Sequence, residues 1–518
     1  MILLSAAQSR ELDRLSRDVY GIASYSLMTR AGEAVAEALV RRFPDALAGG
    51  VLVVCGKGNN GGDGFVAGRR LIEMGVKVDA LLLGKPAELK GDADRAHRDY
   101  HAAGGRGRPA SSESDVAKAF GSPPGAVIDA ILGTGLNAGV KGVARATIDA
   151  INRCNRPVVA VDIASGINAD TGAMMGAAVR ASLTVTFGFA KYGHVSYPGA
   201  HHCGDLEIAE IGFAPRAIDD IAPRGRLLEA PEVRPLIRVR DVNSHKGMYG
   251  HPLVIAGSRG KSGAALLASR GALRMGAGLV TAAIPECVAA VVAAGQAELM
   301  TEPIPDRDGH FDARRASAAL GSLIDGKDAL IVGPGMGLTD GTKDLIAWLI
   351  KHAARADRPM LIDADGLNVL AAVGAEKLKR VKGAVVLTPH PGEMARLLRS
   401  DTATVNADRI SAARELCNRT GAFVLLKGAR TVIAAPDGTV LVNASGNPGM
   451  ATPGMGDALC GILGALLAQK YPPLDALALG TFLHGYAADR VAARVGGVGY
   501  LAGDLIEELP AALDTLTC

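Results

Sequence analysis

Residues 51–64 read VLVVCGKGNNGGDG, five consecutive apolar residues followed by a glycine-rich polar segment. Continuous apolar runs of this length are typical of parallel strands that helices cover on both faces. Similar runs occur at Val76–Leu83, Ala126–Leu132 and Pro157–Ile163, separated by stretches long enough for a helix. The sequence therefore predicts a doubly wound, Rossmann-like α/β domain in the first half of the chain.

A proline-rich stretch separates this domain from a second one. Between residues 211 and 243 four prolines stand among charged residues, a pattern typical of a linker or of a linker with one short strand. Beyond it, apolar runs recur at Pro252–Ala256, Ala277–Ile284, Asp328–Val332, Pro359–Asp363, Ala384–Thr388 and Ala422–Leu426. We therefore expect two α/β domains, residues 1–220 and 227–518, the second closing with helices over 456–469 and 475–494.

The composition excludes several classes of protein. The 518 residues carry 56 Lys and Arg against 53 Asp and Glu, and no basic run stands out, which argues against a nucleic-acid partner. No apolar stretch reaches the roughly 18–20 residues of a membrane span, and the N-terminus lacks a signal-peptide pattern. The seven cysteines are scattered without metal-binding spacing, which indicates free thiols. We expect a cytoplasmic protein without a membrane partner.

Polar residues gather where strands of the first half end. They are Asn59, Asn60, Gly61, Gly62 and Asp63 after one strand, Asp129 with Gly133, Thr134, Gly135, Leu136, Asn137, Ala138 and Gly139 at another, and Asp162 and Ser165 at a third. Doubly wound folds bind ligands at this edge of the sheet. Glycines let the backbone approach a phosphate, and the next helix, expected to begin near Phe65, attracts its charge. The oxygens of Asn60, Asp129, Asp162 and Ser165 suit a hard monovalent or alkaline-earth cation rather than zinc.

In the second half, residues 446–457 read GNPGMATPGMGD and lead into an amphipathic helix. Gly454–Gly456 then stand at a helix N-terminus, which suits a phosphoryl group in transfer. Asp457 is placed to accept a proton from an attacking hydroxyl. An aspartate there also complements the helix dipole, but the preceding glycines favour catalysis.

Loops after other strands of the second half indicate a nucleotide site. Lys427–Thr431 follows one strand, and Gly333–Gly337 and Asp363–Asp365 follow two others. His390 lies between two prolines after a further strand, in a rigid loop that favours a binding role.

Together these motifs resemble the bifunctional NAD(P)H-hydrate repair enzymes. Residues 1–220 are similar to their NAD(P)H-hydrate epimerase domain, with NNGGD as the most specific segment. Residues 227–509 look like their ADP/ATP-dependent NAD(P)H-hydrate dehydratase domain, which is ribokinase-like. The resemblance implies epimerisation of R and S hydrates, and dehydration of the S hydrate to NAD(P)H through phosphorylation of its C6 hydroxyl, with ADP or ATP and Mg²⁺.

The resemblance also implies roles for single residues. Asn60, Asp129 and Ser165 would bind potassium; Asn59–Asp63, Gly133–Gly139 and the catalytic Asp162 would contact hydrate in the epimerase. Ala264, Gly337, His390 and the catalytic Asp457 would contact hydrate in the dehydratase, and Lys427, Gly428, Ala429, Arg430, Thr431 and Gly456 the nucleotide. Ala164 and Pro453 depart from the family pattern, replacing a proline and a glycine.

Two other functions are compatible with the motifs. A small-molecule kinase of the vitamin-precursor type shares the ribokinase-like fold, and the first half would then be only a binding module. The joint presence of Asn60, Asp129, Asp162 and Ser165 favours the repair enzyme. The choice between ADP and ATP, the preference for hydrated NADH or NADPH, and a homo-oligomeric state stay open.

Overall fold

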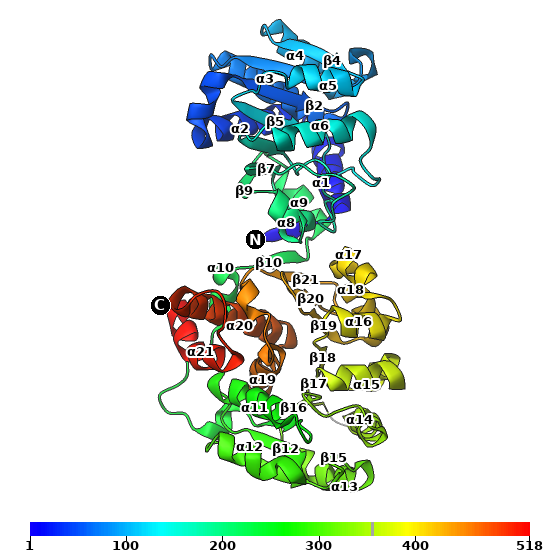
Figure 1. The fold of residues 1–518 in the computed structure, drawn as a ribbon, viewed down its shortest axis with the longest axis vertical. Helices are drawn as coiled ribbons and strands as arrows, with labels where there is room; N and C mark the ends of the chain where they lie inside the picture. The colour runs from blue at the N-terminus through cyan, green and yellow to red at the C-terminus, as the bar shows by residue number, and fades with distance from the viewer. Residues whose placement is uncertain (354–356, 518) are drawn as a thin grey trace. The chain divides into compact units, whose positions relative to one another are not determined.

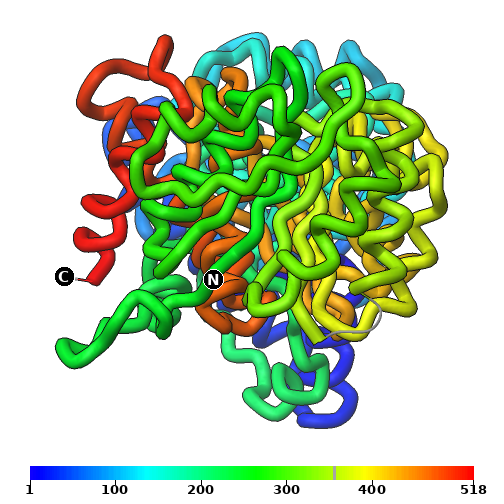
Figure 2. Tube along the Cα trace, turned by 90° about the horizontal axis from the view of Figure 1, so that it is seen from below, coloured from blue at the N-terminus to red at the C-terminus, as the bar shows by residue number. Residues whose placement is uncertain are grey.

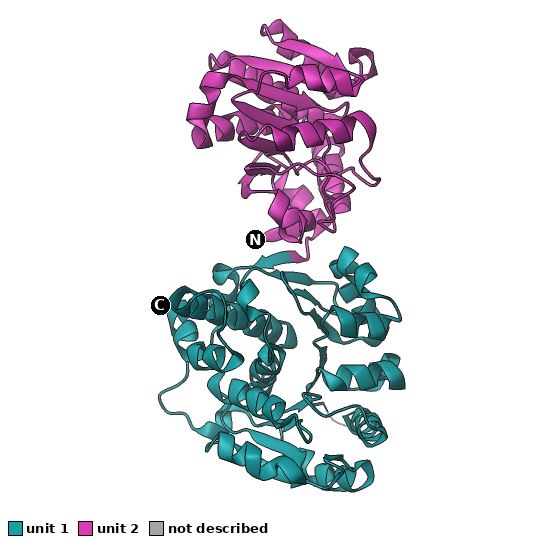
Figure 3. Cartoon of the chain, in the orientation of Figure 1, with its two compact units in different colours: residues 1, 226–518 teal, residues 2–225 magenta. Residues whose placement is uncertain are grey.

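The computed structural model describes residues 1–353 and 357–517, which form two compact units (Figure 3). One unit spans residues 2–225, and the other comprises Met1 and the chain from residue 226 onward. Each unit has a hydrophobic core of its own.

The unit of residues 2–225 is built on a sheet with strand order β4-β3-β2-β5-β6-β7-β9 (Figure 1). Its strands are β2 (Val51–Cys55), β3 (Val78–Leu83), β4 (Arg106–Ala110), β5 (Ala126–Ala130), β6 (Val158–Val161), β7 (Leu183–Phe187) and β9 (Asp205–Ala209). All neighbouring pairs are parallel. The winding reverses between β2 and β5, so the loops after these strands flank the switch point at which such sheets bind ligands.

Helices cover both faces of this sheet. The helices of this unit are α1 (Ala6–Asp18), α2 (Ser24–Arg42), α3 (Asn59–Glu73), α4 (Gly91–Ala102), α5 (Glu113–Ala119), α6 (Gly142–Arg153), α7 (Tyr192–Val195), α8 (Gly199–His202) and α9 (Pro215–Ile221). Outside the seven-stranded sheet, β1 (Ile2–Leu4) pairs in parallel with β8 (Ala190–Lys191). Val53 and Cys55 of β2 join the core with α2, α3 and α4, whereas Leu52 and Val54 join the core with α5 and α6. Burial on both faces explains why β2 is apolar throughout.

In the other unit the strands follow the order β13-β12-β11-β16-β17-β18-β19-β20-β21-β10. Their bounds are β10 (Gly225–Leu228), β11 (Pro252–Ile255), β12 (Thr281–Pro285), β13 (Met300–Ile304), β16 (Ala329–Val332), β17 (Met360–Ile362), β18 (Val385–Leu387), β19 (Phe423–Leu426), β20 (Val432–Ala434) and β21 (Val440–Asn443), with β14 (Asp306–Arg307) and β15 (His310–Phe311) pairing separately. Pairs from β13 to β19 are parallel, and β19, β20 and β21 pair antiparallel.

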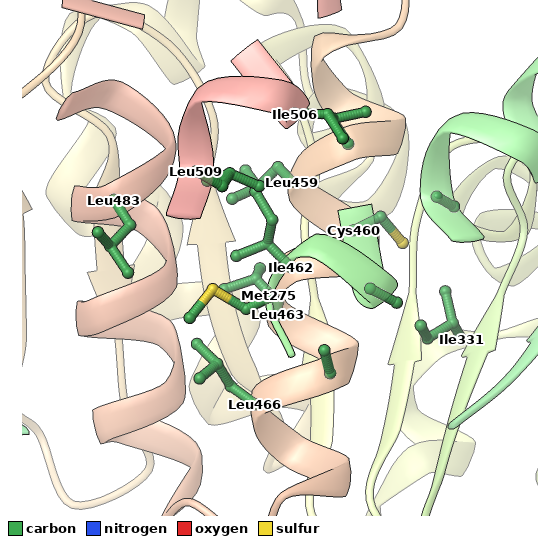
Figure 4. Packing of buried hydrophobic residues seen from close by; sticks show 14 of the residues in the cluster. Met275, Ile331, Leu459, Cys460, Ile462, Leu463, Leu466, Leu483, Ile506 and Leu509 are labelled. Carbon is green, nitrogen blue, oxygen red and sulfur yellow. The ribbon is translucent and has the colours of Figure 1, made fainter. Parts of the chain in front are cut away.

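Two groups of helices flank this second sheet (Figure 1). One group holds α10 (Ala230–Val233), α11 (Ser262–Arg274), α12 (Ala289–Gly295), α19 (Met455–Ala468), α20 (Pro473–Val495) and α21 (Ala502–Thr517). The other holds α13 (Ala313–Ile324), α14 (Asp340–Ala353), α15 (Asp365–Val373), α16 (Pro391–Leu398), α17 (Thr402–Ala407) and α18 (Arg409–Thr420). Helix α19 is almost entirely buried: Ile462 and Leu463 pack with Leu483 of α20 and Leu509 of α21 (Figure 4). This packing anchors the helix whose N-terminus the sequence singles out.

The predicted α/β fold class, with a parallel sheet in each half, is confirmed, but the helix expected near Phe65 begins six residues earlier, at Asn59. The glycines of this segment have low helix propensity. Here they allow close packing instead, because a Cβ on Gly61 would lie 2.0 Å from Gly56 O and one on Gly64 would lie 2.5 Å from Ala130 Cβ. Tertiary contacts therefore outweigh local propensity.

The predicted linker also differs from expectation. Residues 211–243 contain one short strand, β10, as one of the two alternatives allowed, but they also contain the helices α9 and α10. The longest part of this region without helix or strand runs from residue 237 to 245, and it stands out from its unit as a green loop in Figure 2. Val239 and Val242 on this loop are exposed.

Two further expectations can be compared with the described residues. None of the helices there combines the length and the apolar character that crossing a bilayer requires. The six described cysteines are free, as their spacing predicts, and four of them are buried.

Candidate active sites of the two units

The loops after β5 and β6 place Ser165 against Asp129. Asp129 is fully buried, and its carboxylate accepts hydrogen bonds from the Ser165 hydroxyl at 2.6 Å and the Ser165 N–H at 2.8 Å. The Ser165 oxygen in turn accepts one from Leu132 N–H at 2.9 Å. Burial raises the pKa of Asp129 to about 6, although these hydrogen bonds favour the ionised form. The result is a buried cluster of oxygens at the carboxyl edge of the sheet.

Asn60 lies in the first turn of α3, beside the loop that follows β5. Its amide packs against Gly133, where a Cβ would lie 3.1 Å from Asn60 Oδ1. The amide nitrogen is buried and has no hydrogen-bond partner within the described structure. A half-turn of the side chain exchanges the oxygen and nitrogen of an amide, so either atom can take this position. An unpaired buried polar atom costs about 1–3 kcal/mol, which marks a place for a ligand atom.

The residues predicted to bind potassium are all oxygen donors. Asp129 supplies one carboxylate, and Asn60 and Ser165 offer neutral oxygens. Within residues 1–353 and 357–517, no three His, Cys, Asp or Glu side chains are grouped so that they could hold a metal ion. A single carboxylate matches the charge of K⁺ better than that of a divalent ion.

Asp162 follows β6 with φ = +64°, a conformation that residues other than glycine rarely adopt. Its carboxylate accepts hydrogen bonds from Lys191 Nζ at 2.5 Å and the Thr186 hydroxyl at 2.9 Å. Burial would raise the pKa of Asp162, but the Lys191 ammonium and these hydrogen bonds outweigh burial, and the pKa is lowered. Asp162 is therefore an ionised carboxylate held in one orientation.

Two further carboxyl groups lie within the electrostatic reach of Asp162. Burial, followed by the charges of Asp162 and Asp13, raises the pKa of Asp63 well above its usual range. Asp13 of α1 keeps an accessible surface, yet burial and then Asp162 raise its pKa to about 6. Sequence reasoning missed Asp13 and Lys191, because each has the local pattern of an ordinary surface charge.

The remaining predicted epimerase contacts differ in exposure. Gly61 and Gly62 are buried, and their missing side chains serve the packing of α3 against its neighbours. Asn59 is exposed, and Gly133–Gly139 form an irregular, largely accessible loop after β5. Asn59 follows β2, Gly133–Gly139 follow β5 and Asp162 follows β6, so all of them lie at the carboxyl edge of the sheet.

In the other unit, Lys427 and Asp363 meet at the start of α19. Lys427 Nζ donates to Asp363 Oδ1 at 2.7 Å, and their side chains are 19% and 1% exposed. A Cβ on Gly456 would lie 3.4 Å from Lys427 Nζ, so the ammonium contacts the first turn of the helix. Gly454 caps this turn with φ = +87°, which favours glycine. The first-turn amides of α19 and the ammonium together suit an anionic ligand.

Asp457 lies in the same turn of α19. Burial raises its pKa to about 6, the negative charges of Asp363 and Asp365 add to the rise, and Lys427 partly offsets it. A carboxyl group with this pKa is mostly ionised at neutral pH and remains a better base than a solvated aspartate.

Asp365 connects two of the predicted hydrate contacts. Its Oδ2 accepts hydrogen bonds from the Gly337 N–H at 2.9 Å and from Lys261 Nζ at 3.0 Å. A Cβ on Gly335 would lie 2.9 Å from that of Ala264, so the loop after β16 touches the start of α11. Gly337 and Ala264 thus belong to one region at the carboxyl edge of the sheet.

His390, a third predicted contact, caps α16. Its Nδ1 accepts hydrogen bonds from the N–H groups of Gly392 and Glu393, and Glu393 accepts one from the His390 N–H at 2.8 Å. Burial, then the charge of Lys427, lowers the pKa of His390, whereas burial raises the pKa of Glu393 to about 7. The histidine is neutral at pH 7, and its side chain is half exposed. The sequence signal for Glu393 was the capping-box spacing His-x-x-Glu.

The predicted nucleotide loop, Lys427–Thr431, joins the antiparallel strands β19 and β20. Arg409 of α18 donates to the carbonyl oxygens of Leu426 and Lys427 at 3.0 and 3.1 Å. A Cβ on Gly428 would lie 3.0 Å from the same guanidinium. Arg409, which sequence reasoning missed, therefore stabilises the backbone at the start of this loop.

Two recesses among the described residues of this unit are lined by different elements. One, of about 570 Å³, is lined by residues that precede strands, among them Asp328, Pro359 and Ala384. It is remote from the carboxyl edge and contains none of the predicted site residues. The other, of about 430 Å³, includes Pro453 and Ala502 and borders the N-terminus of α19. The second recess is the one adjacent to the candidate site.

Family models match both parts of the chain: NAD(P)H-hydrate dehydratase over residues 252–511, and YjeF-related protein N-terminus over residues 24–193. The bifunctional NAD(P)H-hydrate repair enzyme of Moorella thermoacetica is 41% identical over 522 residues, which cover 100% of this chain and 97% of the relative. The chain belongs to the family of bifunctional NAD(P)H-hydrate repair enzymes.

Other members of the family match nearly the whole chain as well. The enzyme of Coxiella burnetii is 38% identical over 98% of both chains, and that of Escherichia coli is 36% identical over 96% of this chain and 92% of its own. A similar solved structure is the ADP/ATP-dependent NAD(P)H-hydrate dehydratase from Bacillus subtilis, co-crystallized with ATP/Mg²⁺. It is 29% identical with a TM-score of 0.49, and the match covers 56% of this chain and 98% of that one.

The two departures from the repair-enzyme pattern leave the local geometry intact. Ala164 precedes Ser165, whose N–H and hydroxyl still bind Asp129. Pro453 is exposed and stands before the capping Gly454, so the N–H that it lacks is not one of the first-turn amides of α19.

Proposed function

We propose that this repair enzyme restores hydrated NADH and NADPH through one activity in each unit. The unit of residues 2–225 interconverts the R and S hydrates, and the other dehydrates the S hydrate at the expense of ADP or ATP. Family membership over the full chain supports both activities. The observation that carries the proposal is the meeting of Lys427, Asp363 and Asp457 at the first turn of α19. We expect the repair to take place in the cytoplasm.

Dehydration requires a better leaving group than hydroxide at C6. Asp457 would take the proton of the C6 hydroxyl as its oxygen attacks the terminal phosphorus of the nucleotide, so that a C6–O–P bond forms and the phosphoanhydride bond breaks. Phosphate then leaves as the ring nitrogen forms a double bond to C6, and loss of a C5 proton restores NAD(P)H. Lys427 and the first-turn amides would stabilise the negative charge of the phosphoryl group.

The proposed ligand contacts follow the loops of the carboxyl edge. The nucleotide would contact Lys427, Gly428, Ala429, Arg430, Thr431 and Gly456, and the hydrate Ala264, Gly337 and His390. Mg²⁺ bound with the nucleotide would neutralise charge on its phosphates. The described residues offer no three-ligand cage of His, Cys, Asp or Glu, which fits an ion held mainly by phosphates and water.

Asp162 is the proposed base of the epimerase. Because C6 carries both oxygen and nitrogen, deprotonation of its hydroxyl opens the C6–N1 bond to an aldehyde while the proton passes to N1. Rotation and reclosure on the other carbonyl face yield the second epimer without net oxidation. Asn60, Asp129 and Ser165 would hold K⁺, which would supply a fixed positive charge, and Asn59–Asp63 and Gly133–Gly139 would contact the hydrate.

The test uses the full chain with mixed R and S hydrates, Mg²⁺ and either nucleotide. Asp457→Asn should abolish recovery of NADH and release of phosphate while R and S still interconvert. With Asp162→Asn, NADH should be recovered only from the S hydrate present at the start, because R hydrate is no longer converted to S. A stable phosphorylated alcohol in place of phosphate and NADH would identify a kinase instead, and equal loss of both activities in both variants would contradict the two-site proposal.

A further inference from the structure

Lys191, at the end of β8, is one of the most deeply buried charged side chains of its unit. The residue is 1% exposed, and its ammonium donates to Asp162 at 2.5 Å and to the Thr186 hydroxyl at 2.8 Å. Pairing of β8 with β1 fixes its backbone, with Leu4 opposite Lys191. A buried lysine is rare unless a partner compensates its charge. The sequence motifs of the epimerase leave this residue without a role.

His194 holds the backbone on both sides of the ion pair. Its Nδ1 accepts a hydrogen bond from the Lys191 N–H at 2.9 Å, so the proton lies on Nε2, which donates to the Asp162 carbonyl oxygen at 2.8 Å. Burial lowers the pKa of His194 to about 4, so the ring is neutral at pH 7. The carboxylate and the ammonium are thus positioned by one neutral side chain.

The side chains of Asp162 and Lys191 differ in solvent exposure. The side chain of Asp162 is 14% exposed, whereas that of Lys191 is 2% exposed. Only the carboxylate therefore reaches the accessible side of the site, and the ammonium lies behind it.

We propose that Lys191 is a positioning residue of the epimerase, which keeps the Asp162 carboxylate ionised and oriented toward the C6 hydroxyl of the hydrate. This inference rests on the proposed role of Asp162 as the base. Lys191 itself exchanges no proton with the substrate, because it lies behind the carboxylate. The Asp162 backbone, which is in the left-handed region, is held by His194 and by the Val185 carbonyl oxygen instead.

The charges around Asp162 explain why the ammonium is needed. Asp13 and Asp63 lie within its electrostatic reach, with pKa values that burial raises, His194 is neutral, and Lys191 is the main group that offsets the burial of Asp162. Removing the ammonium takes away the largest influence that lowers the pKa of Asp162 and leaves its burial, which raises the pKa. The base would then be protonated over part of the neutral range, and the acid limb of the epimerase pH profile would move to higher pH.

The experiment compares Lys191→Met with Lys191→Arg in the full chain, with Lys118→Met on the exposed face of α5 as the matched control. Interconversion of purified R hydrate is followed without nucleotide, so that dehydration does not interfere. For Lys191→Met we expect kcat at pH 7 to fall about tenfold or more, KM to stay within about twofold, and the acid limb to rise by about 1–3 pH units. Lys191→Arg should retain more activity and a smaller shift, and Lys118→Met should match the native chain.

Two results would overturn the inference: unchanged kcat in Lys191→Met, or an equal loss at every pH with no movement of the acid limb, which indicates a purely structural lysine. Asp162→Asn separates this inference from the proposal beneath it. If Asp162→Asn keeps its epimerase activity, the assignment of the base is wrong whatever the lysine does. If only that variant is inactive, the base is correct and the role of Lys191 is wrong.

Discussion

The ammonium of Lys427 donates a hydrogen bond to Asp363 over 2.7 Å, with both side chains withdrawn from solvent. Burial alone would lower the pKa of Lys427, but Asp363 and Glu393 raise it, so the lysine stays charged. The dehydratase unit thus maintains a positive charge beside the first turn of α19, where the phosphoryl group is proposed to bind.

Replacing Asp363 with Asn should destabilise this unit, because the change leaves a buried ammonium without its carboxylate. We expect the free energy of unfolding to fall by about 3 kcal/mol, as for other broken buried pairs. Denaturant titration of the full chain measures the loss. Lys261→Met is the control: Lys261 pairs with Asp365 but is 52% exposed, so its removal should cost no more than about 1 kcal/mol. Similar costs for both variants would contradict this account.

The dehydratase should lose activity as the pH falls through about 6. Asp457 has a pKa raised to about 6 by burial, so the ionised base is present above that pH and is lost below it. A profile of kcat/KM for S hydrate against pH should show this acid limb. Asp457→Asn should lower kcat by about a hundredfold or more and remove the limb. A limb that persists in the Asn variant would assign the base to another group.

Removal of K⁺ should slow the epimerase and leave the dehydratase unchanged. In the proposed site, the unpaired amide of Asn60 and the single carboxylate of Asp129 would bind one monovalent cation. Replacing K⁺ with tetramethylammonium should lower R-to-S interconversion and the Tm of this unit. In Asp129→Asn both responses to K⁺ should vanish. Recovery of NADH from pure S hydrate is the internal control, because it should not depend on K⁺. Potassium dependence that survives in this variant would rule out the proposed ligand.

Glycines at two helical positions should respond oppositely to alanine. Gly461 of α19 faces α11 so closely that a Cβ would lie 1.9 Å from Ala268 O, and Gly461→Ala should destabilise the unit by about 2 kcal/mol or more. At Gly321 of α13 a Cβ would meet no neighbouring atom within 4 Å, so Gly321→Ala should raise stability by about 0.5–1 kcal/mol. Thermal unfolding of both variants provides the comparison. Equal effects would mean that the α11–α19 contact relaxes freely.

Patterns within short segments determined much of what is known about this chain. The apolar run Val51–Cys55 predicts a strand buried on both faces, and the structure has it at the centre of a parallel sheet. The glycines before Asp457 predict a helix N-terminus there, and α19 begins at Met455. Such features depend on neighbouring residues only, so one sequence suffices to predict them.

Contacts between distant segments were decided by the tertiary structure alone. Lys191 and Asp162 are 29 residues apart, and their ion pair exists because β8 pairs with β1 and β6 ends beside it. The start of α3 at Asn59 likewise depends on close packing against Gly56 and Ala130. A charge or a glycine has the same local pattern whether it is solvated or buried. Whether such a residue is solvated or buried depends on the neighbours that the folded chain places around it.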